Sequence, residues 1–472
     1  MKFYLTTTIP YVNAEPHIGN TLEFIQADVY VRYRRLMRDD VVFSTGTDEH
    51  GQKIYQKALE NNEAPQEYVD RFAEKVRDVT RVLGLSNDRF IRTTDPKHKA
   101  AAQEFWKRCD AAGDIYKKQY KIKYCVGCEL EKTDSELENG ICPLHPSLVV
   151  QTIDEENYFF RLSKYQDQLL SFYKEKEDFV IPRFRINEII SLIEREGLQD
   201  FSISRLKSKM PWGVPVPGDD EQVMFVWFDA LVNYISTLGW PEDEVTFNTY
   251  WPGVQFAGKD QVRQQAVMWQ AMLLSAKLPM TKQIFIHGFL SVDGQRISKS
   301  LGNVISPFDL VDKYGQDAAR YLMLRHVSPY EDTDVSWTKF TEWYNAGLAN
   351  GVGNLASRIM KLAEDNLDAC PVLADNALPL EYTTALDGYE FNKAMDYVWL
   401  QIQHLDQRIN TDEPFKVVKV DAEKGKQMIA ELVVGLHTVA HLLTPFMPET
   451  SEKIKAAVRD NKKPESLFKR LD

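Results

Sequence analysis

The sequence predicts an α/β fold built on a parallel sheet, followed by an all-helical region. Three observations predict it. Short β-branched or aromatic runs alternate with segments of helical periodicity up to about residue 325, which is typical of parallel βαβ units. A compact group of cysteines and a histidine interrupts this alternation. After Ser336 only helical periodicity remains.

The first predicted pair of elements is a strand over residues 3–8 and a helix over residues 21–38, joined by a tight turn. Such a turn brings backbone N–H groups and the positive end of a helix dipole to one point, where an anion is stabilised. His17 and Gly19 lie in this turn, and the imidazole of His17 can donate a hydrogen bond to a phosphate oxygen. The alternative is a structural histidine whose hydrogen bonds are satisfied within the protein. A second phosphate-binding element is needed to decide.

A second strand is predicted over residues 41–45, before a helical pattern over residues 52–61. Ligands of parallel βαβ units bind at the carboxyl ends of the strands, so we expect Asp48, Glu49 and His50 at that edge. The alternative is a helix N-cap whose acidic side chains interact favourably with the helix dipole.

Two pairs of metal-ligating residues lie between residues 117 and 147. Cys125 and Cys128 form the first pair, and Cys142 and His145 form the second. This spacing matches a tetrahedral Cys3His zinc site. Because four protein ligands leave no open position, we expect a structural metal that contributes on the order of 10 kcal/mol of folding free energy. Chance pairing of ordinary buried cysteines is the alternative.

Three further strands are predicted over residues 223–227, 254–257 and 284–288, and Arg205 lies in loop material before them. Trp227 and Tyr234, near the first of these strands, are candidates for the wall of a pocket. Aromatic residues at strand–helix junctions also pack in cores, which is the alternative.

The loop over residues 294–303 is the second candidate phosphate-binding element. It is flanked by glycines and carries Arg296, Lys299 and two serines, a combination that can close around a polyphosphate. A solvated basic loop is the alternative. It is weakened because His17 supplies another phosphate-binding element at a strand end of the same predicted domain.

Apolar residues at helical spacing predict a bundle of helices after Ser336. The two stripes are Phe391, Ala394, Met395, Val398, Ile402 and Leu405, and Leu432, Leu436, Val439 and Leu443.

Length and composition describe a globular protein of roughly two to four domains. Of the 472 residues, 44% are hydrophobic and 27% are charged. The formal net charge of -12 argues against general electrostatic adhesion to nucleic acid or to anionic membranes, although it permits a local basic face. No apolar run approaches the ~18 residues of a membrane span, and residues 1–11 do not read as a signal peptide. We therefore expect a cytoplasmic protein with no membrane partner.

Two short motifs, His17-Ile18-Gly19-Asn20 and Arg296-Ile297-Ser298-Lys299-Ser300, resemble the signature motifs of the class I aminoacyl-tRNA synthetases. Further segments follow the order of the methionyl-tRNA synthetase family, and the likeness covers nearly the whole chain. These segments are Pro10-Tyr11-Val12-Asn13, Gly46-Thr47-Asp48-Glu49-His50-Gly51, Ser202-Ile203-Ser204-Arg205, Trp227-Phe228-Asp229-Ala230, Gly258-Lys259-Asp260 and Asn354-Leu355-Ala356-Ser357-Arg358. The single Cys3His group resembles the bacterial members with one zinc.

This resemblance implies a reaction in two steps. Methionine and ATP form methionyl-adenylate and pyrophosphate, and the aminoacyl group then passes to the 3′ end of tRNA(Met), both initiator and elongator. Mg2+ is expected with ATP because the phosphate charge needs neutralisation. Catalysis would rest on positioning and electrostatics without a covalent enzyme intermediate.

The resemblance also assigns roles to individual residues. Those that would bind ATP or stabilise the departing pyrophosphate are His17, Gly19, Asn20, Arg205, Arg296 and Lys299. Asp48 and the carbonyl of Ile9 would hold the α-ammonium of methionine. The walls of the thioether pocket would be Tyr11, Trp227, Ala230, Tyr234, Gln261 and Gln265.

The chain departs from the family pattern at five positions in these motifs. Asn20 replaces the second histidine of the first motif, and Arg296 and Ile297 replace a lysine and a methionine of the second. Gln261 and Gln265 replace an isoleucine and a histidine of the methionine pocket. The amide of Gln265 can still donate a hydrogen bond to a sulfur or to a tyrosine hydroxyl.

Three residues match positions with which the family reads the anticodon. Asn354 and Arg358 share one helix face because they are four residues apart. Phe415 stands in place of a stacking tryptophan, and base stacking is worth about 1–3 kcal/mol. Without the resemblance, all three would be ordinary residues of a helix surface.

The expected organisation has four segments. Residues 1–116 and 219–325 are the two halves of a Rossmann-type catalytic domain, residues 117–218 are an insertion with the zinc knuckle, and residues 326–472 are a stem-contact segment and a helical anticodon-binding domain. The insertion is too short for the editing domain of the isoleucine, valine and leucine relatives. The chain ends at Asp472 without the appended domain that makes some relatives dimers, so a monomer is expected.

Two other functions stay open at this point, and a third, a small-molecule nucleotidyltransferase, is disfavoured because it would leave the helical region without a purpose. The first is another class I aminoacyl-tRNA ligase with an altered amino-acid pocket. The second is a catalytically silent tRNA-binding paralogue, although the presence of His17, Asp48, Arg205 and Lys299 argues against it.

Overall fold

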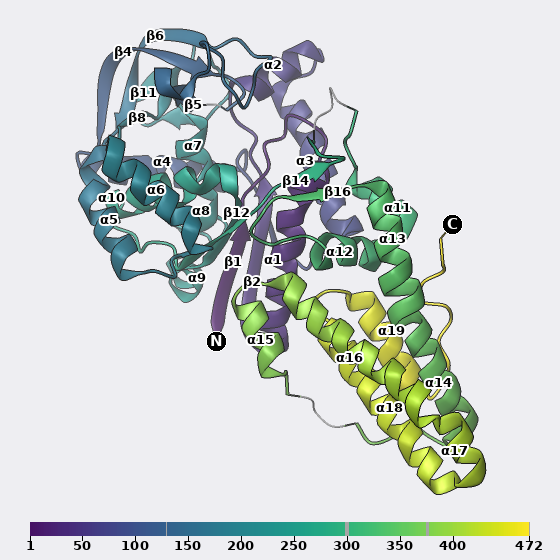
Figure 1. Cartoon of the computed structure of the whole chain (residues 1–472). Helices are drawn as coiled ribbons and strands as arrows, with labels where there is room; N and C mark the ends of the chain where they lie inside the picture. Colours follow the sequence, from purple (N-terminus) through teal and green to yellow (C-terminus); the bar gives the residue numbers. More distant parts are fainter. Residues whose placement is uncertain (129, 298–301, 374–376, 472) are drawn as a thin grey trace. The chain divides into compact units, whose positions relative to one another are not determined.

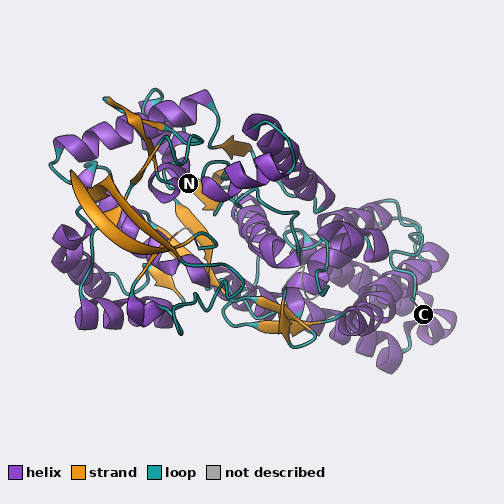
Figure 2. Cartoon of the chain, turned by 90° about the horizontal axis from the view of Figure 1, so that it is seen from above, coloured by secondary structure: helices purple, strands orange, loops and turns teal. Residues whose placement is uncertain are grey.

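The computed structural model describes residues 1–472 except 129, 298–301, 374–376 and 472. The chain forms two compact units, and each combines segments that are distant in the sequence. The first unit comprises Met1–Pro16, Asp40–Asp78 and Asn87–Ile286, and the second comprises His17–Asp39, Val79–Ser86 and His287–Asp472. The predicted α/β class is confirmed, with a parallel sheet and a helical C-terminal region (Figures 1 and 2). The division into four segments stays a prediction.

A six-stranded sheet lies at the centre of the first unit, in the order β3-β2-β1-β12-β13-β7. Its strands are β1 Lys2–Thr7, β2 Asp40–Thr47, β3 Arg89–Arg92, β7 Val180–Ile181, β12 Val254–Gly258 and β13 Gln283–His287. Leu5 of β1 pairs in parallel with Phe43 on one side and with Val254 on the other. Almost every residue of β1, β2 and β12 is buried, as expected for parallel strands covered on both faces.

Helices of the first unit pack around a large aromatic and aliphatic core that includes Phe105, Trp106, Phe228 and Trp269. The helices that begin in this unit are α2 Gln52–Glu60, α3 Pro65–Val82, α4 Pro96–Ala111, α5 Gln166–Glu175, α6 Arg183–Glu196, α7 Val226–Ala230, α8 Asn233–Ser236, α9 Glu244–Tyr250 and α10 Trp269–Ser275. A 3-10 turn, η3 Lys259–Gln261, and a π-helical turn, η4 Gln264–Met268, precede α10.

Two smaller antiparallel sheets complete the first unit. The strands of the four-stranded sheet, in order, are β5 Leu130–Lys132, β4 Ile115–Cys125, β6 Gln151–Phe160 and β8 Phe201–Ser202. The strands of the three-stranded sheet are β10 Pro215–Val216, β11 Asp219–Met224 and β9 Ser204–Leu206. Arg205 therefore lies on a short strand, not in a loop as expected.

The strand predicted over residues 223–227 is wrong in its second half. The strand β11 ends at Met224, and Val226–Ala230 form the helix α7. Phe225 is extended and caps this helix, and its carbonyl accepts the N–H of Phe228 at 2.9 Å. The apolar run does not predict this change, because a short buried strand and a short buried helix have the same apolar pattern.

The second unit contains α1 Ile18–Leu36, a small sheet and the helices of the C-terminal region. The sheet has the order β15-β14-β16, with β14 Leu290–Val292, β15 Gln295–Arg296 and β16 Thr333–Val335. The helices are α11 Pro307–Tyr314, α12 Gln316–Arg325, α13 Trp337–Tyr344, α14 Asn354–Asn366, α15 Leu380–Asp387, α16 Phe391–Asp412, α17 Pro414–Val420, α18 Ala422–Leu443 and α19 Pro448–Arg459, with the π-helical segment η6 Asn345–Gly353 before α14.

The predicted helical bundle is confirmed, since every residue of the two apolar stripes is buried on α16 or α18. The part of the chain near the C-terminus is drawn almost entirely as helix in Figure 2. Among the described helices, none has the length and apolar character needed to cross a membrane.

Candidate active site

The turn before α1 is organised by its own side chains. His17 is the N-cap of α1, and its Nδ1 accepts the N–H of Gly19 at 3.1 Å. The Oδ1 of Asn20 accepts the N–H of His17 at 3.2 Å, which completes a capping box. Because Nδ1 is an acceptor, the proton of a neutral His17 lies on Nε2. The turn therefore fixes the imidazole as a hydrogen-bond donor at a helix N-terminus, a position that favours anions.

The end of β2 is joined by backbone hydrogen bonds to the loop after β1. The N–H of Asp48 donates to the carbonyl of Pro10 at 3.0 Å, and the N–H of Val12 donates to the carbonyl of Asp48 at 3.1 Å. Tyr11 and Asp48 form an isolated parallel bridge between these bonds. The carboxylate of Asp48 is mostly buried, with 7% of the residue exposed, and Ile9 is half-buried. Two predicted substrate residues are thus brought side by side.

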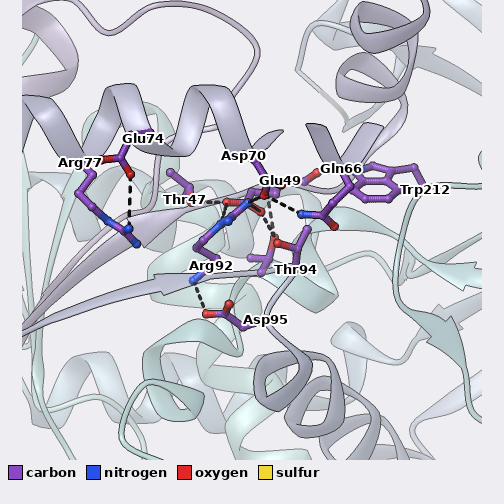
Figure 3. A network of polar contacts seen from close by, with 11 residues as sticks. Thr47, Glu49, Gln66, Asp70, Glu74, Arg77, Arg92, Thr94, Asp95 and Trp212 are labelled. Atoms are coloured by element: carbon purple, nitrogen blue, oxygen red, sulfur yellow. Dashed lines mark hydrogen bonds and ion pairs between the residues drawn. The ribbon is translucent and has the colours of Figure 1, made fainter. Parts of the chain in front are cut away.

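Glu49 holds this turn in place through hydrogen bonds of its side chain and its backbone (Figure 3). Its buried carboxylate accepts from Arg92 Nε at 2.7 Å and Nη2 at 2.9 Å, and from Thr47 Oγ1 at 2.6 Å. Arg92 also donates to Asp70 at 2.6 Å. The carbonyl of Glu49 accepts from Trp212 Nε1 at 2.6 Å. These bonds fix the backbone on which Asp48 is carried.

A buried aspartate links the same turn to α7. Asp229 Oδ2 lies 2.5 Å from His50 Nδ1, and Asp229 Oδ1 lies 2.8 Å from His98 Nε2. Burial alone raises the pKa of Asp229, but His50 and His98 hold it well below its usual value. The sequence singled out His50 but missed His98, because a single histidine on α4 carries no signal of its partner more than a hundred residues away.

A hydrogen bond joins two members of the predicted pocket wall. Gln265 Nε2 donates to the hydroxyl of Tyr234 at 2.7 Å, and both residues are buried. Ala230 is buried on α7, and Gln261 is half-buried on η3. Trp227 and Tyr11 both pack against one apolar cluster, which consists of Tyr124, Val126, Met210, Val223 and Phe225. The predicted donation from Gln265 to a tyrosine hydroxyl is therefore present.

Arg205 is buried, and its hydrogen-bond partners among the described residues are a hydroxyl and a carbonyl, not a carboxylate. Its Nη1 donates to Ser202 Oγ at 2.6 Å and to the carbonyl of Ser204 at 2.7 Å. The guanidinium lies 3.9 Å from the centre of the Phe225 ring, a cation–π distance. Its Nη2 is buried and has no hydrogen-bond partner in the described part of the chain. A buried guanidinium with an unused donor is suited to an anionic ligand group.

The second phosphate-binding motif is only partly described. Arg296 is exposed on β15, and its carbonyl accepts from Asn303 Nδ2 at 3.1 Å. Lys299 lies outside the described residues.

The four predicted metal ligands converge, with their ligand atoms within 4.8 Å of one another. Cys128 Sγ lies 3.5 Å from Cys142 Sγ and 3.2 Å from His145 Nδ1, and Cys125 Sγ lies 3.8 Å from the same Nδ1. A tetrahedron with zinc–sulfur bonds of about 2.3 Å has edges of roughly 3.7 Å, so this cluster could bind zinc. A Cβ on Gly127 would lie 2.4 Å from the His145 ring, which explains the glycine in this knuckle.

The predicted anticodon residues lie on the helices of the second unit. Asn354 is exposed on α14, and Phe415 of α17 is 37% exposed. Arg358 forms an ion pair with Asp406, and its Nη2 donates to Asn410 Oδ1 at 2.8 Å. The sequence does not identify these two partners, because they lie on α16, about 50 residues from Arg358.

Comparisons with known proteins agree with this geometry. The family model described as class I (M) tRNA synthetases matches residues 3–151 and 147–360. The methionine–tRNA ligase of Thermotoga maritima is 40% identical, over 98% of this chain and 76% of the relative, and that of Thermosynechococcus vestitus is 43% identical, over 96% and 89%. The solved structure of Mycobacterium tuberculosis methionyl-tRNA synthetase in complex with methionyl-adenylate superposes with a TM-score of 0.89 at 35% identity, covering 100% of this chain and 99% of that one. The chain therefore belongs to the methionyl-tRNA synthetase family of the class I tRNA synthetases.

Proposed function

We propose that the chain is a methionine–tRNA ligase that activates methionine with ATP and transfers it to tRNA(Met). The observation that carries this proposal is the turn in which Tyr11 and Asp48 are held side by side. It offers a mostly buried carboxylate beside an aromatic ring, which suits an amino acid with a cationic ammonium and an apolar side chain.

The amino acid would be bound by groups of the first unit. Asp48 and the carbonyl of Ile9 would accept hydrogen bonds from its ammonium. Its thioether would lie among Tyr11, Trp227, Ala230 and Tyr234, with Gln261 and Gln265 contributing the polar part of the wall. A pocket of aromatic rings with few polar groups favours a side chain without charge.

ATP would be bound by donors of both motifs. His17, Gly19 and Asn20 would contact phosphate oxygens from the N-terminus of α1, where the helix dipole favours negative charge. Arg205 would use its unpartnered Nη2 on an anionic group of the nucleotide. Arg296 and Lys299 would stabilise the departing pyrophosphate, and the substrate would bring Mg2+ to neutralise its charge.

The knuckle would hold one structural zinc ion through Cys125, Cys128, Cys142 and His145, with no part in the reaction. On the helical region, Asn354, Arg358 and Phe415 would contact the anticodon. The ion pair of Arg358 with Asp406 would hold the guanidinium in place before tRNA binds, which reduces the entropy lost on binding.

Exchange of pyrophosphate into ATP in the presence of single amino acids tests the proposed activity. We expect methionine to support exchange better than any other amino acid, and Asp48→Asn to raise KM for methionine at least about tenfold because the ammonium loses its charged acceptor. Better exchange with another amino acid would favour the altered class I ligase. Binding of tRNA(Met) without any exchange would favour the silent paralogue.

A further inference from the structure

A hydrogen-bonded series of buried, uncharged polar side chains leads from the central sheet to the predicted methionine pocket. Its members are Gln255 of β12, Thr281, Gln270 of α10, Gln265 of η4 and Tyr234 of α8, and none is more than 3% exposed. Thr281 Oγ1 donates to Gln255 Oε1 at 2.7 Å. Gln270 Nε2 donates to Thr281 Oγ1 at 3.0 Å and to the carbonyl of Gln265 at 2.8 Å. Gln265 Nε2 in turn donates to the hydroxyl of Tyr234 at 2.7 Å.

Gln270 is the branch point of this hydrogen-bonded series. Its Nε2 donates to both Gln265 and Thr281, and its Oε1 accepts the backbone N–H of Thr281 at 3.0 Å. The carbonyl it reaches belongs to the π-helical turn η4, where the regular helical hydrogen bonds are interrupted. Gln270 therefore holds the backbone of Gln265 from behind the pocket.

Tyr234 is fixed on three sides. Its backbone carbonyl accepts from the hydroxyl of Tyr4 at 2.9 Å, and its ring meets Trp269 edge to face at 5.8 Å. Gln265 fixes the third side, because its amide donates to the hydroxyl oxygen. With that oxygen accepting from Gln265, the hydroxyl proton of Tyr234 is directed away from the amide.

Apolar residues would fill these core positions at lower desolvation cost. Each buried polar group costs about 1–3 kcal/mol when it is left unpaired, and a hydrogen-bonded network of such groups makes the core more rigid. Among the described residues, this hydrogen-bonded series reaches two of the predicted substrate residues, Gln265 and Tyr234.

We propose that Gln270 is a positioning residue which, through Gln265, directs the hydroxyl of Tyr234 and so favours a thioether over a hydrocarbon side chain of the same length. This inference rests on the proposed function, since it requires Tyr234 to line the methionine pocket. A sulfur atom accepts a weak hydrogen bond, whereas a methylene group accepts none. A correctly directed hydroxyl therefore distinguishes methionine from norleucine, and a displaced one does not.

The test is the ratio of kcat/KM for methionine to that for norleucine in ATP–pyrophosphate exchange. Gln270→Met, which keeps the volume and removes both donated bonds, should lower the ratio about tenfold, mainly through KM for methionine. Thr281→Val should lower it less, and it is the second variant if Gln270→Met does not fold. Ser275→Ala is the matched control on α10, because it removes a buried hydroxyl bonded to Asp114 at 2.8 Å and should leave the ratio unchanged.

A double mutant separates positioning from general loosening of the core. If Gln270 acts through the hydroxyl of Tyr234, Gln270→Met should not lower the ratio further when Tyr234→Phe is already present. An unchanged ratio in both Gln270→Met and Thr281→Val, or a full additional loss in the double mutant, would overturn the inference while leaving the proposed function intact. Wild-type protein without methionine-dependent exchange would overturn the proposed function, and the inference with it.

Discussion

Asp229 has no exposure to solvent, and its two histidine partners determine its charge state. Burial alone favours the neutral acid, yet the pKa of Asp229 is held below its usual value by His50 and His98. A carboxyl with a lowered native pKa contributes stability that is present above its unfolded pKa and is lost as the pH falls through the native one. Because His50 follows the Asp48 turn and Asp229 precedes Ala230, this contribution stabilises two segments of the predicted methionine pocket together.

Asp229→Asn should lower the free energy of unfolding by about 3 kcal/mol at pH 7, because the buried side chains of His50 and His98 lose the carboxylate to which both are bonded. KM for methionine should rise in the same variant. Urea denaturation at a series of pH values is the measurement, and the difference from wild type should shrink as the pH falls. Asp110→Asn, at an exposed position on α4, is the control. A variant as stable as wild type at pH 7 would show that the three residues do not interact as described.

His326 is a second residue whose environment sets its charge. It stacks on Trp343 at 4.4 Å, and its Nε2 lies 3.0 Å from the hydroxyl of Tyr321. Burial and the neighbouring Arg325 lower the pKa of His326 from 6.5 to about 4. Between these two pH values the unfolded chain binds a proton that the native protein does not, so stability rises with pH across this window.

His326→Phe keeps an aromatic ring at this position and removes the titration. Between pH 7 and pH 4, wild type should lose about 1–3 kcal/mol more of its free energy of unfolding than the variant, allowing for partial exposure of the ring. Guanidinium denaturation at both pH values measures this difference. Equal losses in the two proteins would mean that His326 is protonated in the native state.

At the scale of single elements, the knuckle between β4 and β6 has little core of its own. Ile141, Leu144 and Leu148 are exposed by 37% or more, in contrast to the buried residues of the central sheet. Its structure must therefore come from the ligand cluster and from its attachment to the two long strands, which pair from Ile115–Phe160 to Tyr124–Gln151.

Cys142→Ser should abolish stoichiometric zinc, because three ligands bind the ion much less tightly than four. Limited proteolysis should then cut between residues 126 and 148, while the rest of the first unit stays protected. Zinc content by atomic absorption and the masses of the fragments are the measurements. Cys370→Ser, at a half-buried cysteine outside the cluster, is the matched control and should keep one zinc per chain. Full zinc content in Cys142→Ser would contradict the proposed ligand set.

Across the whole molecule, local sequence patterns predicted those features that depend on residues close in the sequence. The helical stripes of α16 and α18, the spacing of the metal ligands and the parallel strands were all readable, because each depends on residues close in sequence. Other features could not be predicted, because they arise where segments distant in sequence pack together. These are the partner of His50, the branch point Gln270 and the partners of Arg358. The predicted strand over residues 223–227 overlaps the first two residues of α7, because a short buried apolar run fits both conformations.

The second unit depends in the same way on one buried pair that joins distant segments. Asp28 of α1 and Arg320 of α12 have no exposed side-chain surface and lie 2.7 Å apart. Arg320 also donates to the carbonyls of Leu83, Pro445 and Phe446, so four segments of the chain meet at one guanidinium. Burial raises the pKa of Asp28, but the nearby guanidinium groups of Arg320 and Arg32 lower it below its usual value.

Removing one partner of this pair should cost more than removing both. Asp28→Leu leaves the charge of Arg320 buried without its counter-ion, so the free energy of unfolding should fall by about 3–5 kcal/mol. Asp28→Leu combined with Arg320→Met leaves no unpaired charge from this pair and should be less destabilised than the single variant. A double-mutant cycle by urea denaturation, with Arg320→Met as the fourth corner, measures the coupling. Additive losses would mean that the carbonyl contacts of Arg320, and not its charge on Asp28, hold these four segments together.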